Sequence, residues 1–253
     1  DGKGYLSGNF KVTGTADKPN INGDLQFNDV AFRVTQLNSY FKDINEKVTV
    51  NNQGIYFDKF TVYDEKNNKL SVNGAVLTQD FRNYNFDLGI VADNFRAVNS
   101  RANDNDLYYG DLFIDANLKV DGTMDNPIIG GNIKINEDTK FTVVLPQSDP
   151  GIAEREGIVE FVDEDNQMLQ QTEALKSELN QSNFKGVDVS VNIQTDKEAL
   201  LSLVIDKGNG DYLNLKGEAD LTGGIDQSGK TTLTGKYEFT EGAYEMTFNL
   251  IKR

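Results

Sequence analysis

Apolar side chains recur at every second position over most of this chain. Such alternation is typical of β-strands that have one apolar face and one wet face. Lys, Asp, Asn, Thr and Ser fill most of the positions between the apolar ones. The clearest runs are Phe10-x-Val12, Leu25-x-Phe27, Leu118-x-Val120, Ile133-x-Ile135, Val187-x-Val189-x-Val191, Leu201-x-Leu203 and Met246-x-Phe248. We therefore expect an all-β protein.

Turn-forming residues separate these runs at short intervals. The 253 residues include 28 Asn and 23 Gly. Pairs typical of tight hairpin turns are Asn22-Gly23, Asn51-Asn52, Asn67-Asn68, Asn73-Gly74 and Gly223-Gly224. Because hairpins join antiparallel strands, we expect a mainly antiparallel meander.

Two segments interrupt the alternation and predict one or two short helices. Residues 163–182 contain no Gly or Pro and carry an apolar stripe at helical spacing. That stripe consists of Met168, Thr172, Leu175 and Leu179. A helical insertion that caps or crosses the sheet is the favoured interpretation, and a disordered excursion is the alternative. A second helical turn fits residues 34–44.

The composition excludes many kinds of chemistry. Without His or Cys, the chain lacks the usual nucleophilic triads, zinc sites and disulfides. The net charge of −15 opposes binding to phosphate, so we expect no nucleic-acid partner. The acidic loops, such as Asp104-Asn-Asp106, do not have the spacing of a calcium-binding loop and are interpreted as solvated turns. We expect no catalytic residue, no metal and no cofactor, and therefore no enzyme.

The ends of the sequence suggest a larger parent protein. No signal peptide opens the chain, and the alternation is still running at the last residues. The longest apolar stretch, residues 199–205, is far shorter than the roughly 18 residues that a membrane-spanning helix needs. We expect residues 1–253 to be a fragment of a longer protein that forms one elongated β domain.

An internal repeat organises much of the chain. Its unit is a strand, a Gly-Thr turn, an Asp-x-Pro break and a returning strand. Copies lie near residues 4–34 and 110–145, and a weaker one lies near 212–250. In the turns, Gly14 and Gly122 are predicted to adopt a positive φ, and Pro19 and Pro127 to stop the strand pairing.

The order and spacing of these units resemble the TamB family, the translocation and assembly module subunit of the AsmA-like superfamily. The Gly-spaced strands at residues 57–74, 85–95 and 233–244 carry the same resemblance. The Asn-rich composition is similar to that of a family member from the Bacteroidota. The resemblance implies an elongated, curled "β-taco", an open barrel-like sheet with a hydrophobic inner groove.

The resemblance also implies a function. Family members provide a groove for lipid transfer between inner and outer membranes and support the assembly of outer-membrane proteins. Phospholipid or other acyl chains and an Omp85-type outer-membrane barrel protein are the implied partners. The implied location is the periplasm, with an inner-membrane anchor outside these residues.

The apolar runs supply the candidate groove residues. They are Phe10, Val12, Leu25, Phe27, Leu118, Val120, Ile133, Ile135, Val187, Val189, Val191, Leu201, Leu203, Met246 and Phe248. The same residues also suit a closed β-sandwich with a dry core. A binding or adhesin-like module without a lipid conduit is therefore the alternative function.

Overall fold

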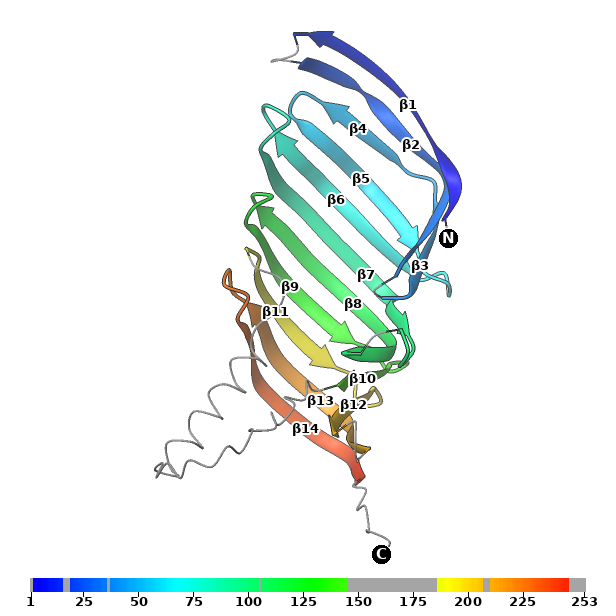
Figure 1. Ribbon diagram of the computed structural model, residues 1–253, viewed down its shortest axis with the longest axis vertical. Coiled ribbons are helices and arrows are strands. Elements are labelled where there is room, and N and C mark those ends of the chain that lie inside the picture. Colours follow the sequence, from blue (N-terminus) through cyan, green and yellow to red (C-terminus); the bar gives the residue numbers. More distant parts are fainter. Residues whose placement is uncertain are drawn as a thin grey trace, which may run out of the picture.

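The computed structural model describes residues 2–15, 19–35, 37–104, 106–144, 186–206 and 210–245. All regular structure in these residues is β-strand, and fourteen strands form one curled sheet (Figure 1), which confirms the predicted fold class. The strands are β1 (Gly2–Gly14), β2 (Pro19–Val34), β3 (Ser39–Ile44), β4 (Lys47–Asn51), β5 (Gly54–Tyr63), β6 (Lys69–Thr78), β7 (Tyr84–Ser100), β8 (Tyr108–Gly122), β9 (Pro127–Ile135), β10 (Lys140–Val144), β11 (Asp188–Thr195), β12 (Leu200–Asp206), β13 (Asp211–Ile225) and β14 (Thr231–Glu245).

Three rows of the sheet are each built from two short strands. Both β3 and β4 pair with β2 and β5, both β9 and β10 pair with β8, and both β11 and β12 pair with β13. The fourteen strands therefore make eleven rows, which stack along the long axis from β1 to β14 (Figure 1).

Most pairs are antiparallel, as predicted, but two are parallel. The pair β9–β11 starts at Ile128 opposite Asp188, and the pair β10–β12 starts at Lys140 opposite Leu200. Both pairs have the same offset, since 188 − 128 and 200 − 140 are both 60. The predicted helix at residues 163–182 falls in the connection between these rows and lies outside the described residues.

The helical turn proposed for residues 34–44 is wrong. The chain instead reverses direction in a turn between β2 and β3. Asn38 adopts a left-handed φ of 49°, and Arg33 donates a 2.9 Å hydrogen bond to the Asn38 carbonyl. The interruption of the alternation marks this turn, and the described residues contain no helix.

The turn predictions succeed in part. Asn51-Asn52 and Asn67-Asn68 do lie in or at hairpin turns, and Gly14 and Gly122 have φ values of 88° and 85°. The predicted turns at Asn22-Gly23, Asn73-Gly74 and Gly223-Gly224 are wrong, because these pairs lie inside β2, β6 and β13. At Gly74 a Cβ atom would collide with the backbone of the neighbouring β7, so glycine there permits close approach rather than a turn.

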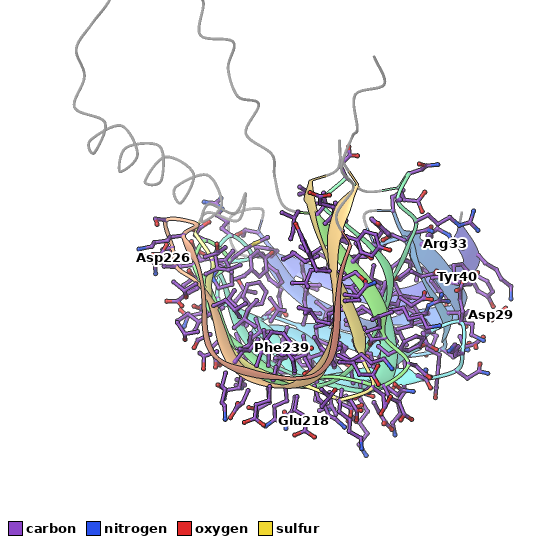
Figure 2. All side chains as sticks on the ribbon, turned by 90° about the horizontal axis from the view of Figure 1, so that it is seen from below. Asp29, Arg33, Tyr40, Glu218, Asp226 and Phe239 are labelled. Atoms are coloured by element: carbon purple, nitrogen blue, oxygen red, sulfur yellow. The ribbon has the colours of Figure 1, made fainter. Side chains whose placement is uncertain are left out.

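A band of bulges and breaks crosses the sheet. Asp29, Lys59 and Asn94 have left-handed φ values of 50°, 50° and 44°, which remove their N–H groups from the regular ladder. A side-chain oxygen of the adjacent row accepts each of these N–H groups, at 2.7 to 2.8 Å. The acceptors are Asn45 for Asp29, Asn73 for Lys59 and Asp115 for Asn94. Bulged strands bend, and Figure 2 shows the U-shaped section that results.

The best-packed apolar cluster lies along this bend. Its centre is Ala92, Phe95 and Ala116, and the Phe95 side chain is 1% exposed. Phe41 from β3 stacks on Phe95 with 5.6 Å between ring centroids. The hydroxyl of Ser39 also donates to the Ala97 carbonyl at 2.7 Å, so β3 is joined to β7 beyond the short hairpin β5–β6.

A buried carboxylate holds the tip of that hairpin. Asp64 is 2% exposed, and its carboxylate accepts hydrogen bonds from the backbone N–H groups of Lys66, Asn68 and Arg96, each at 2.8 Å. The Asn68 side-chain amide adds a fourth at 3.0 Å. Asp64 thus connects the β5–β6 turn to the bulged part of β7.

Removal of this carboxylate should be costly. We expect Asp64→Ala to lower the free energy of unfolding by about 3 kcal/mol, because it leaves buried N–H groups without acceptors. Urea denaturation followed by circular dichroism measures the change. The matched control is Asp87→Ala, which breaks only the exposed pair with Lys119 and should cost less than about 1 kcal/mol. Equal losses for both variants would contradict this role of Asp64.

Candidate functional site

The two faces of the sheet can be assigned from one labelled strand pair. Figure 2 shows Phe239 pointing into the U and Glu218 pointing out of it. In the register Phe239 pairs with Gly217 and Glu238 pairs with Glu218, so the faces alternate along β13 and β14. We call the inward side the concave face and the outward side the convex face.

The register extends the concave face across the whole sheet. One line of paired residues runs from Leu233 through Gly223, Val191 and Gly131 to Leu118. A second line runs in the same direction and reaches β2. It consists of Ile225, Val189, Ile129, Val120, Leu88, Gly74, Phe57, Val48 and Leu25. Nearly all members of both lines are aliphatic, aromatic or glycine.

The structure places most of the candidate groove residues on this face. Phe10, Val12, Leu25 and Phe27 lie at the β1–β2 end. The rows β8, β9 and β11 bring together Leu118, Val120, Ile133, Ile135, Val189 and Val191. Leu201 and Leu203 lie on the far side of the bend, paired with Phe141 and Val143 and with Leu215 and Leu213. Val187 directly precedes β11, whereas Met246 and Phe248 lie outside the described residues.

The groove residues predicted from the sequence do not include the middle of the concave face. Strands β4 to β7 contribute further apolar side chains in the same register lines. The signal was present in the sequence as the runs Val48-x-Val50 and Phe86-x-Leu88-x-Ile90. The additional residues are Val48, Val50, Ile55, Phe57, Val72, Val76, Phe86, Leu88 and Ile90.

The concave side chains are only partly covered. Most of the candidate residues are half-buried, and Val191 is the most enclosed of them at 8% exposed. Exposure rises at both ends, to 65% for Val12 on β1 and 62% for Phe239 on β14. All fourteen described strands belong to one sheet, so the closed two-sheet sandwich is not the architecture of these residues.

The convex face is polar and carries cross-strand ion pairs. Lys119 pairs with Asp87 of β7 and with Asp121 on its own strand β8, and Lys134 pairs with Asp196 at 3.6 Å. Exposed pairs of this kind contribute about 0 to 1 kcal/mol each, so they stabilise the sheet little. The main effect of these charged side chains is to keep the convex face hydrated.

Turns form the two rims of the U. Rim A comprises the turns at residues 51–54, 78–84, 122–127 and 225–231, and rim B comprises those at 34–39, 63–69 and 100–108. Between residues that the structure describes, no hydrogen bond or ion pair joins rim A to rim B. The edge strands also stay apart, since β1 pairs with β2 and β14 pairs with β13. The described sheet is therefore open along its length.

The described residues contain neither a candidate metal cluster nor a candidate membrane-spanning helix. No group of three or more acidic side chains that could hold a metal ion occurs within the described ranges. Asp104 instead accepts a 2.9 Å hydrogen bond from the Arg101 N–H and orders its own turn. In those ranges there is also no helix with the length and hydropathy of a membrane span.

Two carboxylates organise turns of rim A. The N–H groups of Asn83 and Arg82 lower the pKa of Asp80 below its ordinary value of 3.8. The Ser228 hydroxyl and the Lys230 N–H lower the pKa of Asp226 in the same way. A lowered pKa in the folded state means that each ionised carboxylate stabilises the fold above about pH 4, and that this stabilisation disappears as the pH falls through the folded pKa.

This pH dependence can be measured. We expect the double variant Asp80→Asn/Asp226→Asn to be less stable than the wild type at about pH 6, and the difference to shrink towards about pH 3. Urea denaturation at a series of pH values gives both curves. Asp58→Asn, which changes an exposed carboxylate outside these turns, is the control. A difference that stays constant with pH would contradict the role of the two ionised groups.

Comparison with known proteins adds one match. A family model described as the TamB C-terminal domain matches residues 58–253, which is more than half of the chain. Searches of curated proteins and of solved structures found no significant match. The matched part begins inside β5, so β1 to β4 lie before it.

Proposed function

The chain belongs to the TamB family, and from that premise we propose that its concave face carries the acyl chains of phospholipids between inner and outer membranes. TamB proteins are non-enzymatic components of outer-membrane protein assembly and lipid transport. They are in general periplasmic, anchored in the inner membrane, and act with Omp85-type partners. For this chain we propose the same location and partner class.

One observation carries the proposal: an apolar face that no second layer covers within the described residues. A sheet with one apolar face normally hides it against another layer. Eleven rows at about 4.8 Å spacing extend this face over roughly 50 Å, which is longer than one extended acyl chain. The open side between the rims leaves room for a polar headgroup to stay in water.

Apolar contact alone suffices for binding of this kind. Each methylene transferred from water to an apolar surface contributes about 0.8 kcal/mol, so about twelve methylenes contribute on the order of 10 kcal/mol before the costs of association. No fixed polar partner is needed. A continuous face without polar barriers also lets a chain shift from row to row at little cost.

The strands before the matched residues support a longer path. Leu25 of β2 lies in the same register line as the matched strands, and the ring of Phe27 packs edge-on against Phe60 of β5 with 5.1 Å between centroids. The Asp29–Asn45 hydrogen bond also repeats the bulge geometry found in those strands. The apolar face therefore continues from β5 to β1 without a change in its chemistry.

The convex face supports a soluble outer wall. With a net charge of −15, an outer surface rich in carboxylates repels anionic membrane surfaces. Contact with membranes is then confined to the ends of the protein, as transfer between two membranes requires.

Acyl binding can be tested on the purified chain with a fluorescent fatty acid. We expect the paired variant Val189→Asp/Val191→Asp to bind the probe about fifty-fold more weakly, because losing contact with about three methylenes costs about 2.4 kcal/mol. The matched control is Ser190→Asp/Asn192→Asp, which places two aspartates on the convex face of the same strand and should leave binding unchanged.

A second variant separates binding from folding. Phe10 is 43% exposed on the concave face, so Phe10→Asp should weaken probe binding at the β1 end while the circular dichroism spectrum stays native. If the wild-type chain takes up no probe and carries no co-purified lipid by native mass spectrometry, the proposal fails. Unfolding of Val189→Asp/Val191→Asp with normal probe binding by Phe10→Asp would indicate a sealed core instead.

A further inference from the structure

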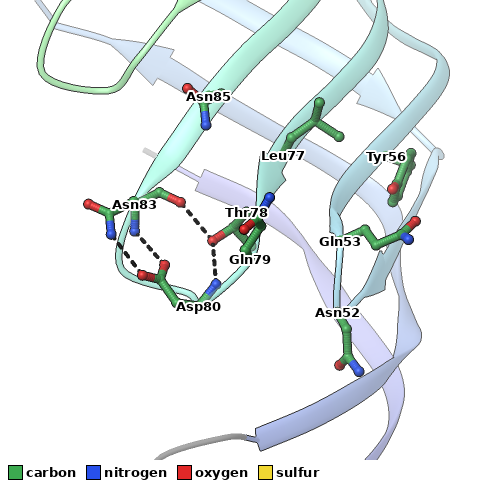
Figure 3. Close-up of a pocket in the computed structure, with 9 residues that line it drawn as sticks. All are labelled: Asn52, Gln53, Tyr56, Leu77, Thr78, Gln79, Asp80, Asn83 and Asn85. Atoms are coloured by element: carbon green, nitrogen blue, oxygen red, sulfur yellow. Dashed lines mark hydrogen bonds between the residues drawn. The ribbon is translucent and has the colours of Figure 1, made fainter.

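A depression of about 910 Å³ lies at rim A, away from the concave face. It opens between the turn at residues 51–54 and the turn at residues 78–84 (Figure 3). Leu77 and Asn85 form a register pair on the convex face, and Tyr56 lies beside them on β5, paired with Ala75. The depression is thus separate from the apolar surface assigned to acyl chains.

Hydrogen bonds hold both turns in place. Asp80 accepts bonds from the Arg82 N–H at 2.9 Å, the Asn83 N–H at 2.8 Å and the Asn83 side chain at 2.7 Å. Thr78 donates its hydroxyl to the Asn83 carbonyl at 2.7 Å and its N–H to the Gln53 carbonyl at 2.8 Å. Figure 3 shows this framework around the β6–β7 turn. The walls of the depression are therefore held by hydrogen bonds within the protein and need no ligand to form.

Other polar side chains of the lining have no hydrogen-bond partner among the described residues. Within the described part of the chain, the side chains of Gln53, Gln79 and Asn85 and the hydroxyl of Tyr56 form no hydrogen bond. A carboxamide offers two donor hydrogens and an acceptor oxygen, so three of them present a mixed array to the depression. Such an array matches hydroxyl groups, which both donate and accept.

The charge of the lining favours a neutral ligand over an ionic one. No Lys or Arg lines the depression, so the lining offers an anion no ion pair. The single carboxylate, Asp80, already accepts three hydrogen bonds from its own turn. The Tyr56 ring and the Leu77 side chain, which is 37% exposed, add apolar surface next to the carboxamides.

We propose that this depression binds a neutral oligosaccharide. The carboxamides of Gln53, Gln79 and Asn85 pair with sugar hydroxyls, while Tyr56 and Leu77 pack against the C–H face of a pyranose ring. A cavity of this volume accommodates several sugar units. The site lies on the polar side of the sheet, so a sugar can be held there while the concave face is occupied or empty.

The test is an NMR titration of the ¹⁵N-labelled full chain with two neutral probes, chitotetraose and maltotetraose. We expect at least one to shift the side-chain amide signals of Gln53, Gln79 and Asn85 with a Kd of about 1 mM or tighter. Tyr56→Ala and Gln79→Ala should each weaken that binding about tenfold. Asn117→Ala, an exposed carboxamide of β8, is the matched control and should not change it.

Each outcome of the titration either supports or overturns the proposed sugar site. A response to chitotetraose alone identifies a preference for N-acetylated sugars, a response to maltotetraose alone identifies plain glucans, and either supports the site. No shift with either probe at about 10 mM, or shifts that Gln79→Ala leaves unchanged, would overturn it. Gln79 lies in an exposed turn, so Gln79→Ala should stay folded and keep normal uptake of the acyl probe, which separates this test from that of the lipid proposal.

Discussion

The capture of a displaced N–H group by an Asn or Asp side chain is the interaction on which this architecture depends. Strands bend sharply where a bulge breaks the regular ladder, and a broken ladder leaves a backbone donor without its usual partner. An unsatisfied buried donor costs about 1 to 3 kcal/mol, and this cost bears most on the part-buried N–H of Asn94, since the bonds of Asp29 and Lys59 are exposed. Asn45, Asn73 and Asp115 each supply the missing acceptor. Asp115 also accepts a bond from Asn136, which ties the β9–β10 break into the same band. The large number of Asn residues thus has a structural use beyond turns.

Much of this fold can be predicted from the period of the apolar residues, because the period fixes which side chains share a face. Leu118, Val120 and Ile133 are assigned to one surface by spacing alone, and the register agrees. Predictions from local turn propensity fail where the conformation of a residue is set by the neighbouring strand. Asn73-Gly74 has the composition of a turn, yet β7 lies so close that only glycine fits within the strand. The parallel pairs β9–β11 and β10–β12 were invisible for a similar reason: pairing across a connection of more than forty residues leaves no mark in either strand. Whether the concave residues act as a lipid path depends on what covers them, and periodicity is silent about that.

The two faces of the sheet separate two kinds of chemistry by the thickness of one backbone layer. Inside the bend, Val, Leu, Ile and Phe give a surface without directional contacts, suited to flexible chains. Outside, carboxylates, lysines and carboxamides give a surface on which geometry matters. The Phe95 cluster lies along the bend, and Asp64 joins the β5–β6 turn to the bulged part of β7. Phe95 and Asp64 are among the largest fully buried side chains of the described residues.

Row-by-row stacking has a consequence for the dimensions of such a molecule. Each row contacts mainly its two neighbours, as in repeat proteins, so adding or removing a hairpin leaves distant rows undisturbed. A hairpin adds two rows, or about 10 Å. The end-to-end distance then increases in even steps with the number of hairpins, and a lineage of such proteins can match a wider or narrower compartment by duplication or loss of a repeat. The length of the sheet is therefore set by the number of hairpins that the sequence encodes.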